Sequence, residues 1–138
     1  MTEARYSKLE EQISFLSKFK DEHKVIIFDN TAASETEELA RTFGKLTPRR
    51  IITATYSYVA DVISETRAKL GEVAPFDLFL KTFTEEYVIF ISEFDNFKEC
   101  SKEEQEFFQM LVRFNLDSLI IITGSDIRGI GKALLKKI

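Results

Sequence analysis

The clearest feature in the pattern of apolar and polar positions is a run of five apolar residues that leaves no polar face. Residues 87–91 (YVIFI) are apolar without interruption, and polar residues follow at once from Ser92. A short apolar run of this kind predicts a strand buried on both faces, as in parallel sheets covered by helices on each side. Residues 24–28 (KVIIF), 51–55 (IITAT) and 119–122 (LIII) predict three more strands.

Amphipathic stretches alternate with these strands. Apolar residues recur at three- and four-residue steps, as expected for helices that cover a sheet. Capping-box patterns (S-x-x-E) begin at Ser34 and Ser101 and predict helix starts there. Gly44 is expected to end the helix that follows Ser34, in the left-handed conformation. Helices are predicted at residues 3–20, 34–43, 58–70, 75–83 and 101–114 and from about residue 127 onward.

This alternation predicts the fold class. Strands that alternate with helices form right-handed crossovers and a parallel sheet. We therefore expect a single α/β domain over residues 1–138, a three-layer α/β/α sandwich with a mainly parallel four-stranded sheet. An N-terminal amphipathic helix within residues 1–22 is expected to pack on the core. The pattern leaves the strand order open.

Composition excludes several classes of function. The net charge of −4 gives no overall basic field for nucleic acid or anionic membranes. One cysteine and one histidine, Cys100 and His23, exclude an internal disulfide and a Cys/His metal site. No apolar stretch approaches the ~20 residues of a membrane helix, and no secretory signal is visible, so we expect a cytoplasmic protein. Abundant Ile, Lys and Glu are typical of thermophilic proteins.

Polar residues end all four predicted strands. In a parallel sheet these ends meet at one edge, where α/β proteins bind ligands. The same residue types are the preferred helix caps, so a purely structural role is the alternative interpretation. The residues concerned are Asp29, Asn30 and Thr31, then Thr55, then Ser92, Glu93 and Asp95, then Thr123, Ser125 and Asp126.

Three segments resemble the core of P-loop NTPases, of the RecA/KaiC-like or archaeal AAA-type branches. KVIIF is followed by an eight-residue loop and a helix, as in the P-loop. VIFISEFDNF is similar to a Walker B strand with its following acidic residue. LIIITGSDIRGI is similar to the sensor strand of archaeal ATPases, with Thr123 and Ser125 as the sensor-like residues. The resemblance covers residues 24–126 and implies a P-loop-like fold.

The loop departs from the Walker A pattern G-x-x-x-x-G-K-[ST]. The matching segment is residues 29–36, which includes Asn30 and Thr31 and in which Thr36 fits the last position. Asp29 and Ser34 replace the two glycines, and Glu35 replaces the lysine. Two carboxylates against a triphosphate would cost on the order of several kcal/mol.

The Walker B-like strand departs too. Ser92 stands where the resemblance implies a magnesium-positioning aspartate, Glu93 matches the catalytic glutamate, and Asp95 follows. The resemblance therefore implies a degenerate, non-catalytic module that does not bind ATP normally and needs no cofactor. Such a module would act as an interaction or regulatory domain, with a protein partner or a second copy of itself. Phe94 and Phe97 are candidates for an exposed apolar patch, with burial in the core as the alternative.

A second hypothesis is an enzyme. KVIIFDNT also resembles the nucleophile strand of haloacid-dehalogenase-like phosphatases, which implies Asp29 as the phosphoryl acceptor. Thr123 or Ser125 would then hold the phosphate, Lys132 would be the lysine, and Glu93 with Asp95 would bind magnesium. Thr31 and Ala33 depart from that family's pattern.

A third hypothesis is an accessory protein that binds nucleic acid. It requires Arg49 and Arg50, before one strand, to gather on one face with Arg128 and Lys132, after another. With 23 acidic residues in the chain, a solvated surface is the competing interpretation.

Overall fold

The computed structural model describes residues 2–4, 8–19, 24–61, 87–99, 101–102, 105–106, 108–109 and 119–134. Its strands are β1 (Thr2–Ala4), β2 (Lys24–Phe28), β3 (Arg50–Thr55), β4 (Tyr87–Ser92) and β5 (Leu119–Thr123). Its helices are α1 (Leu9–Ser17), α2 (Ala33–Gly44), the 3-10 helix η1 (Phe94–Glu99) and α6 (Ile130–Leu134), with a further helical segment at residues 56–61. The predicted helix at residues 75–83, His23 and Cys100 lie outside the described residues.

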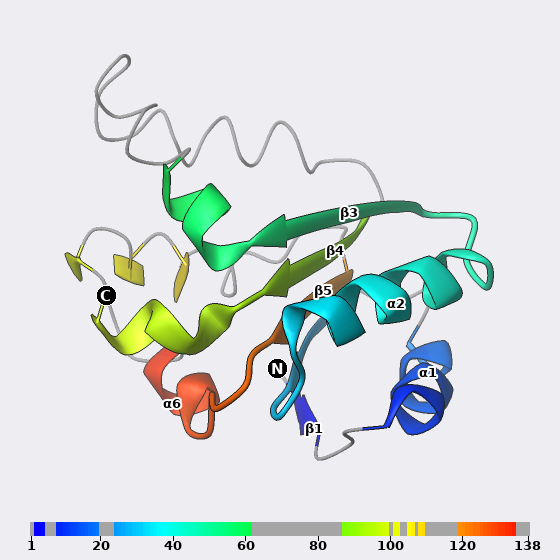
Figure 1. The fold of residues 1–138 in the computed structure, drawn as a ribbon, viewed down its shortest axis with the longest axis horizontal. Helices are drawn as coiled ribbons and strands as arrows, with labels where there is room; N and C mark the ends of the chain where they lie inside the picture. The colour runs from blue at the N-terminus through cyan, green and yellow to red at the C-terminus, as the bar shows by residue number, and fades with distance from the viewer. Residues whose placement is uncertain are drawn as a thin grey trace.

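The strands form one parallel sheet in the order β1-β2-β5-β4-β3 (Figure 1). The four predicted strands are confirmed, and so are their parallel pairing and the α/β class. β5, the last strand along the chain, lies between β2 and β4. β4 is thus separated from β2 by one strand, although both carry unbroken apolar runs.

β1 is a fifth strand, which the sequence pattern wrongly predicted as the start of a helix. Residues 3 and 4 were expected to begin a helix, but Thr2–Ala4 pairs in parallel with β2, and α1 starts only at Leu9. The outer edge of β2 would otherwise present unpaired backbone groups, and the ladder with β1 satisfies them. A three-residue strand is too short to show a periodicity of its own.

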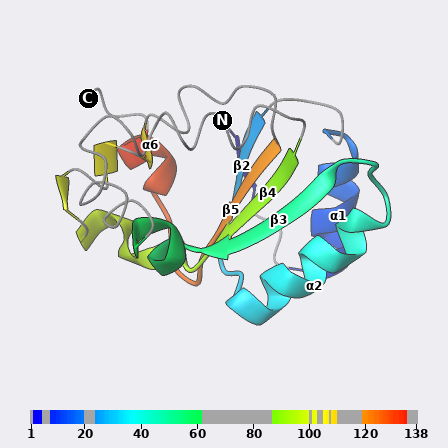
Figure 2. The same ribbon diagram turned by 90° about the horizontal axis from the view of Figure 1, so that it is seen from above.

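Helices cover both faces of the sheet (Figure 2). α1 and α2 pack on one face, and α6, η1 and residues 56–61 pack on the other. Alternate side chains of each strand enter the two cores: Ile26 and Phe28 face α1 and α2, whereas Val25 and Ile27 face the opposite layer. The three-layer sandwich therefore has a separate apolar core on each side of the sheet.

The direction of the chain explains this division. It steps from β1 through β2 to β3 at the far edge, and then returns through β4 to β5. Right-handed crossovers that run in opposite directions lie on opposite faces. The loop after β2 leads to α2 on one face, and the loop after β5 leads to α6 on the other, so the sheet has a topological switch point between these neighbouring strands. Open α/β sheets bind ligands at such points.

Both ends of α2 differ from the prediction. The helix starts at Ala33, before Ser34, and the side chain that reaches back over its first turn is Glu35, not Glu37. At the other end Gly44 belongs to the last turn, and Lys45 caps it in the right-handed region. Gly44 lies close to β3, since a Cβ there would be 3.2 Å from Cγ1 of Ile51.

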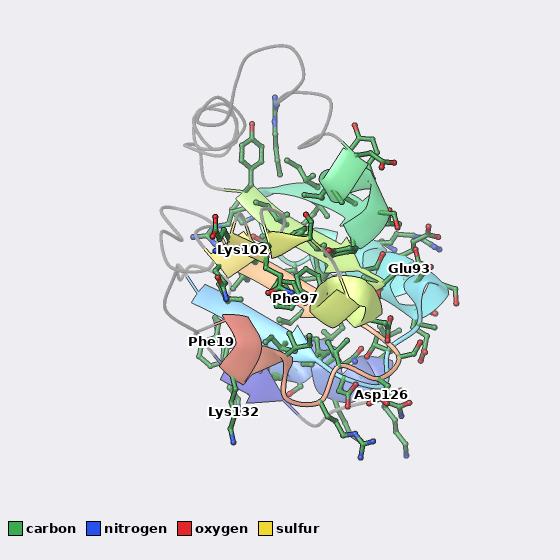
Figure 3. The ribbon with its side chains drawn as sticks, turned by 90° about the vertical axis from the view of Figure 1, so that its left-hand side faces the viewer. Phe19, Glu93, Phe97, Lys102, Asp126 and Lys132 are labelled. Carbon is green, nitrogen blue, oxygen red and sulfur yellow. The ribbon has the colours of Figure 1, made fainter. Side chains whose placement is uncertain are left out.

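Of the two interpretations of Phe94 and Phe97, burial in the core is confirmed, and the two residues form no exposed patch. Both rings are buried, with 0% and 1% of their surface exposed. Phe94 packs edge-on against Tyr56 at 5.2 Å and stacks with Phe97 at 5.2 Å between ring centroids. Phe108 contacts all three rings. η1 turns the side chains of Phe94 and Phe97 under the sheet, and Figure 3 shows Phe97 between the ribbons.

Candidate functional site

The polar residues that follow β2, β4 and β5 meet at the carboxyl edge of the sheet, at the switch point. The carboxylate Oδ1 of Asp29 accepts a hydrogen bond from the backbone amide of Ile127 at 2.8 Å. The amide of Thr31 donates to the carbonyl of Gly124, also at 2.8 Å. These two bonds join the loop after β2 to the loop after β5, so the chain's own contacts bridge the switch point.

A third contact reaches this loop from α1. Gln12, which is 1% exposed, donates from Nε2 to the hydroxyl of Thr31 at 3.0 Å. The same hydroxyl donates to the carbonyl of Asp29 at 3.0 Å. Thr31 is buried, so its side chain connects α1 to the end of β2 inside the protein.

At the start of α2, a carboxylate from the first turn accepts a hydrogen bond from a backbone amide. The amide of Ala32 donates to Oε1 of Glu35 at 2.9 Å. Free amides at a helix start are where phosphates and other anions bind, because these groups point out of the helix and carry partial positive charge. Here Glu35 supplies the negative charge from within the chain. Ser34, at the second glycine position of the Walker pattern, is exposed.

Thr36, at the last position of that pattern, points into the protein. Its side chain and that of Thr123 are 2% and 0% exposed, and their hydroxyl oxygens are 2.7 Å apart. Thr36 donates to the carbonyl of Ala32 at 2.9 Å. Because a hydroxyl carries one hydrogen, Thr123 is then the donor to Thr36. Both hydroxyls are engaged inside the protein.

Of the three polar side chains at and after the end of β4, one is buried and two are exposed. Ser92 is buried, and its hydroxyl lies 3.5 Å from the carbonyl of Ala54. Glu93 is exposed and has φ of 57°, the left-handed region that costs residues with a side chain about 1 kcal/mol or more. Asp95 accepts the amide hydrogen of Asp126 at 2.8 Å. It thereby connects η1 to the loop after β5.

Gly124 lies where these loops pack most closely. A Cβ at this position would be 2.4 Å from Cγ2 of Ile127 and 3.2 Å from Oδ2 of Asp95. Only a residue without a side chain fits this position without displacing its neighbours. Gly124 was part of the sensor-like segment, but no feature of that segment singled out the glycine itself.

Thr55 is half-buried, and its hydroxyl accepts the amide hydrogen of Tyr58 at 3.1 Å, whereas other predicted site residues face solvent. Asn30 and Ser125 are exposed, and Asn30 has φ of 53°, which asparagine tolerates. Glu93 and Asp126 lie at the surface (Figure 3). Within the part of the chain that the structure describes, no group of three or more His, Cys, Asp or Glu residues could hold a metal ion. Nor is any described helix long and apolar enough to cross a bilayer.

The basic residues of the nucleic-acid hypothesis are not brought together. Arg49 and Arg50 lie at the start of β3, whereas Arg128 and Lys132 follow the end of β5. The strands are parallel, so the two pairs lie at opposite ends of the sheet. Arg49 is also buried, and Nε of Arg128 is 3.2 Å from the carboxylate of Asp126.

Gln12 is the functional candidate that sequence reasoning missed. A signal was present, because Gln12 falls between Leu9 and Leu16 on the apolar stripe of the N-terminal helix. A polar residue at a stripe position is buried with the stripe, and a buried amide requires a partner. That partner, Thr31, is 19 residues away and could not be identified from spacing.

No family model and no curated protein matches this chain. The site is therefore interpreted from its own chemistry. The amides of Thr31, Ala32, Asp126 and Ile127 all donate to acceptors of the chain itself. This edge has the location of an α/β ligand site, and these four amides already have partners.

Proposed function

We propose that this chain is a non-catalytic domain related to P-loop ATPases, which does not bind ATP normally and acts by binding another protein or a second copy of itself. The fold supports the proposal. In the RecA-like and AAA-type ATPases that the chain resembles, the sensor strand lies between the P-loop strand and the Walker B strand. β5 has the equivalent position here, between β2 and β4.

The observation that carries the proposal is the bond between Glu35 and the amide of Ala32, 2.9 Å long. In a working P-loop, backbone amides at the helix start wrap the phosphates, and a lysine neutralises them. Here one such amide holds a carboxylate at the lysine position. A triphosphate would have to displace Glu35 and then remain beside its charge.

A second observation points the same way. The resemblance implies that Thr36 would hold magnesium, yet its hydroxyl is bonded to Thr123 and Ala32 inside the protein. Asp29, at the first glycine position, uses its carboxylate to fix the amide of Ile127. Nucleotide binding would therefore require breaking contacts that hold the loop in place.

Calorimetric titration with ATP and Mg²⁺ tests the first part of the proposal. We expect no binding by the native protein up to about 1 mM nucleotide. The combined change Asp29→Gly, Ser34→Gly and Glu35→Lys restores the Walker pattern and is expected to gain weak binding. Glu35→Gln, which removes the charge but not the shape, is the matched control. Micromolar binding by the native protein would overturn the proposal.

The phosphatase hypothesis is the second candidate, and Asp29 is its test residue. Asp29 is half-buried at the end of β2, beside β5, which is compatible with a nucleophile position. Thr123, however, is fully buried and bonded to Thr36, so Ser125 is the hydroxyl left for a substrate phosphate. Hydrolysis of a small phosphate ester that is lost in Asp29→Asn would favour this candidate over the binding module.

A further inference from the structure

We propose that α1 is a detachable strap, and that its docking on the sheet locks the loop after β2 through Gln12. The proposal concerns how the loop is held and stands whether or not the chain is related to P-loop ATPases. Its central contact is the hydrogen bond from Nε2 of Gln12 to the hydroxyl of Thr31, 3.0 Å long and buried.

α1 is weakly built as a helix. It has nine residues, fewer than the about 12–15 that an isolated helix needs for marginal stability in water. Its N-cap is Lys8, which makes no side-chain capping bond, and its last turn has no basic residue. Glu10 and Glu11 in the first turn suit the helix dipole, but the helix has neither a side-chain N-cap bond nor a positive charge in its last turn. The helix therefore depends on its packing, and undocking and unwinding are expected to occur together.

Most of the apolar side chains of α1 are also only half-buried. Of its side chains only Gln12 and Leu16 are fully buried, whereas Leu9, Ile13 and Phe15 are half-buried. α2, on the same face, buries Leu39, Ala40 and Phe43 fully, among others. Since buried apolar area is the main source of docking energy, α1 is the less firmly held of the two helices.

The buried bond transmits the state of α1 to the loop. Thr31 accepts from Gln12, donates to the carbonyl of Asp29, and donates through its amide to Gly124. When α1 undocks, the hydroxyl of Thr31 loses its hydrogen bond from the Gln12 amide. The hydroxyl also becomes accessible to water, because α1 no longer covers it. The loop and its bond to the end of β5 then become easier to open.

Amide hydrogen exchange on the full chain tests the strap. In Gln12→Ala we expect exchange at Thr31, Ala32 and the amides of α1 to rise about tenfold, the effect of losing one buried hydrogen bond. Alanine is the best helix former, so the change does not weaken α1 as a helix. Amides of β4 and β5 are expected to keep their rates.

Ser17→Ala is the matched control. It also converts a polar residue of α1 to alanine, but Ser17 is exposed and bonds only locally, to the carbonyl of Ile13 at 2.8 Å. It is expected to leave the loop unchanged. An unchanged loop in Gln12→Ala, or an equal rise at every amide of the protein, would overturn the proposal.

A second measurement follows from the mutual coupling of α1 and the loop, and it does not need the Gln12 variant to fold. If α1 and the loop are coupled, a change in the loop must loosen α1 by the same factor. Thr31→Val, which removes the hydroxyl, is expected to raise exchange in α1 about tenfold. Thr31→Ser, which keeps it, is expected to restore the native rates. Faster exchange confined to the loop in Thr31→Val would contradict the coupling.

Discussion

The carboxylate of Asp29 and the backbone amide of Ile127 are hydrogen-bonded at 2.8 Å, although the residues are 98 positions apart in the chain. This bond joins the ends of β2 and β5 across the switch point of the sheet. It uses the carboxylate that the phosphatase hypothesis assigns to the phosphoryl group. The free energy of this contact is therefore open to direct measurement.

Replacing Asp29 by alanine should lower the free energy of unfolding by about 1–2 kcal/mol, because the amide of the buried Ile127 loses its acceptor. Asp29→Asn keeps an oxygen at the same place and should cost less. Urea denaturation of the two variants measures the difference. Equal losses in both would mean that the charge of Asp29, and not its hydrogen bond, stabilises the loops.

Gly124→Ala should destabilise the protein by about 1–3 kcal/mol, as overpacking does elsewhere. Its Cβ would be 2.4 Å from Ile127 and 3.2 Å from Asp95. Gly44→Ala is the matched control, since the nearest atom there is 3.2 Å away, on the side chain of Ile51, and alanine favours the helix. Thermal unfolding should show a clear loss for Gly124→Ala and little change for Gly44→Ala.

The two buried threonines should differ in the cost of their removal. Thr36→Val leaves the buried Thr123 hydroxyl without its acceptor, whereas Thr123→Val leaves Thr36 still bonded to Ala32. We expect a loss of about 1–3 kcal/mol for the first and a smaller loss for the second. The double variant should cost less than the sum, which a double-mutant cycle by denaturation measures. Strict additivity would show that the 2.7 Å contact contributes nothing.

At position 93, the backbone conformation that a residue prefers should affect stability more than its charge does. At φ of 57° a glycine is unstrained and a β-branched residue is strongly disfavoured. Stability should therefore fall in the order Gly, Glu, Val at this position, with about 1–2 kcal/mol between the two extremes. Comparison of the melting temperatures of Glu93→Gly and Glu93→Val checks the order. A lower melting temperature of Glu93→Gly than of the native protein would show that side-chain contacts of Glu93 outweigh the backbone strain.

The fold class could be predicted because strands buried on both faces are short, unbroken apolar runs in the sequence. Residues 87–91 and 119–122 have no polar position, and both are strands. The strand order could not be predicted, because β2, β4 and β5 have the same apolar pattern. β1 was missed because pairing with the edge of β2, and not any periodicity, makes Thr2–Ala4 a strand.

The candidate site was predictable in its location but not in its contacts. That Asp29 and Thr123 lie at one edge follows from the ends of parallel strands. That Glu35 bonds Ala32, three residues away, would have followed from a helix start at Ala33, but the S-x-x-E pattern pointed to Ser34 instead. For Phe94 both exposure and burial stayed open, because the turn of η1, which buries the ring, has no marker in the sequence.

The central place of β5 has a consequence for synthesis. The ribosome makes β2 and β4 well before residues 119–123, which fill the gap between them. Until then a nascent chain carries two strands with open, apolar edges, and such edges promote aggregation. Because closing the sheet joins residues far apart in sequence, folding should be slow for a domain of this size and should finish only after β5 emerges.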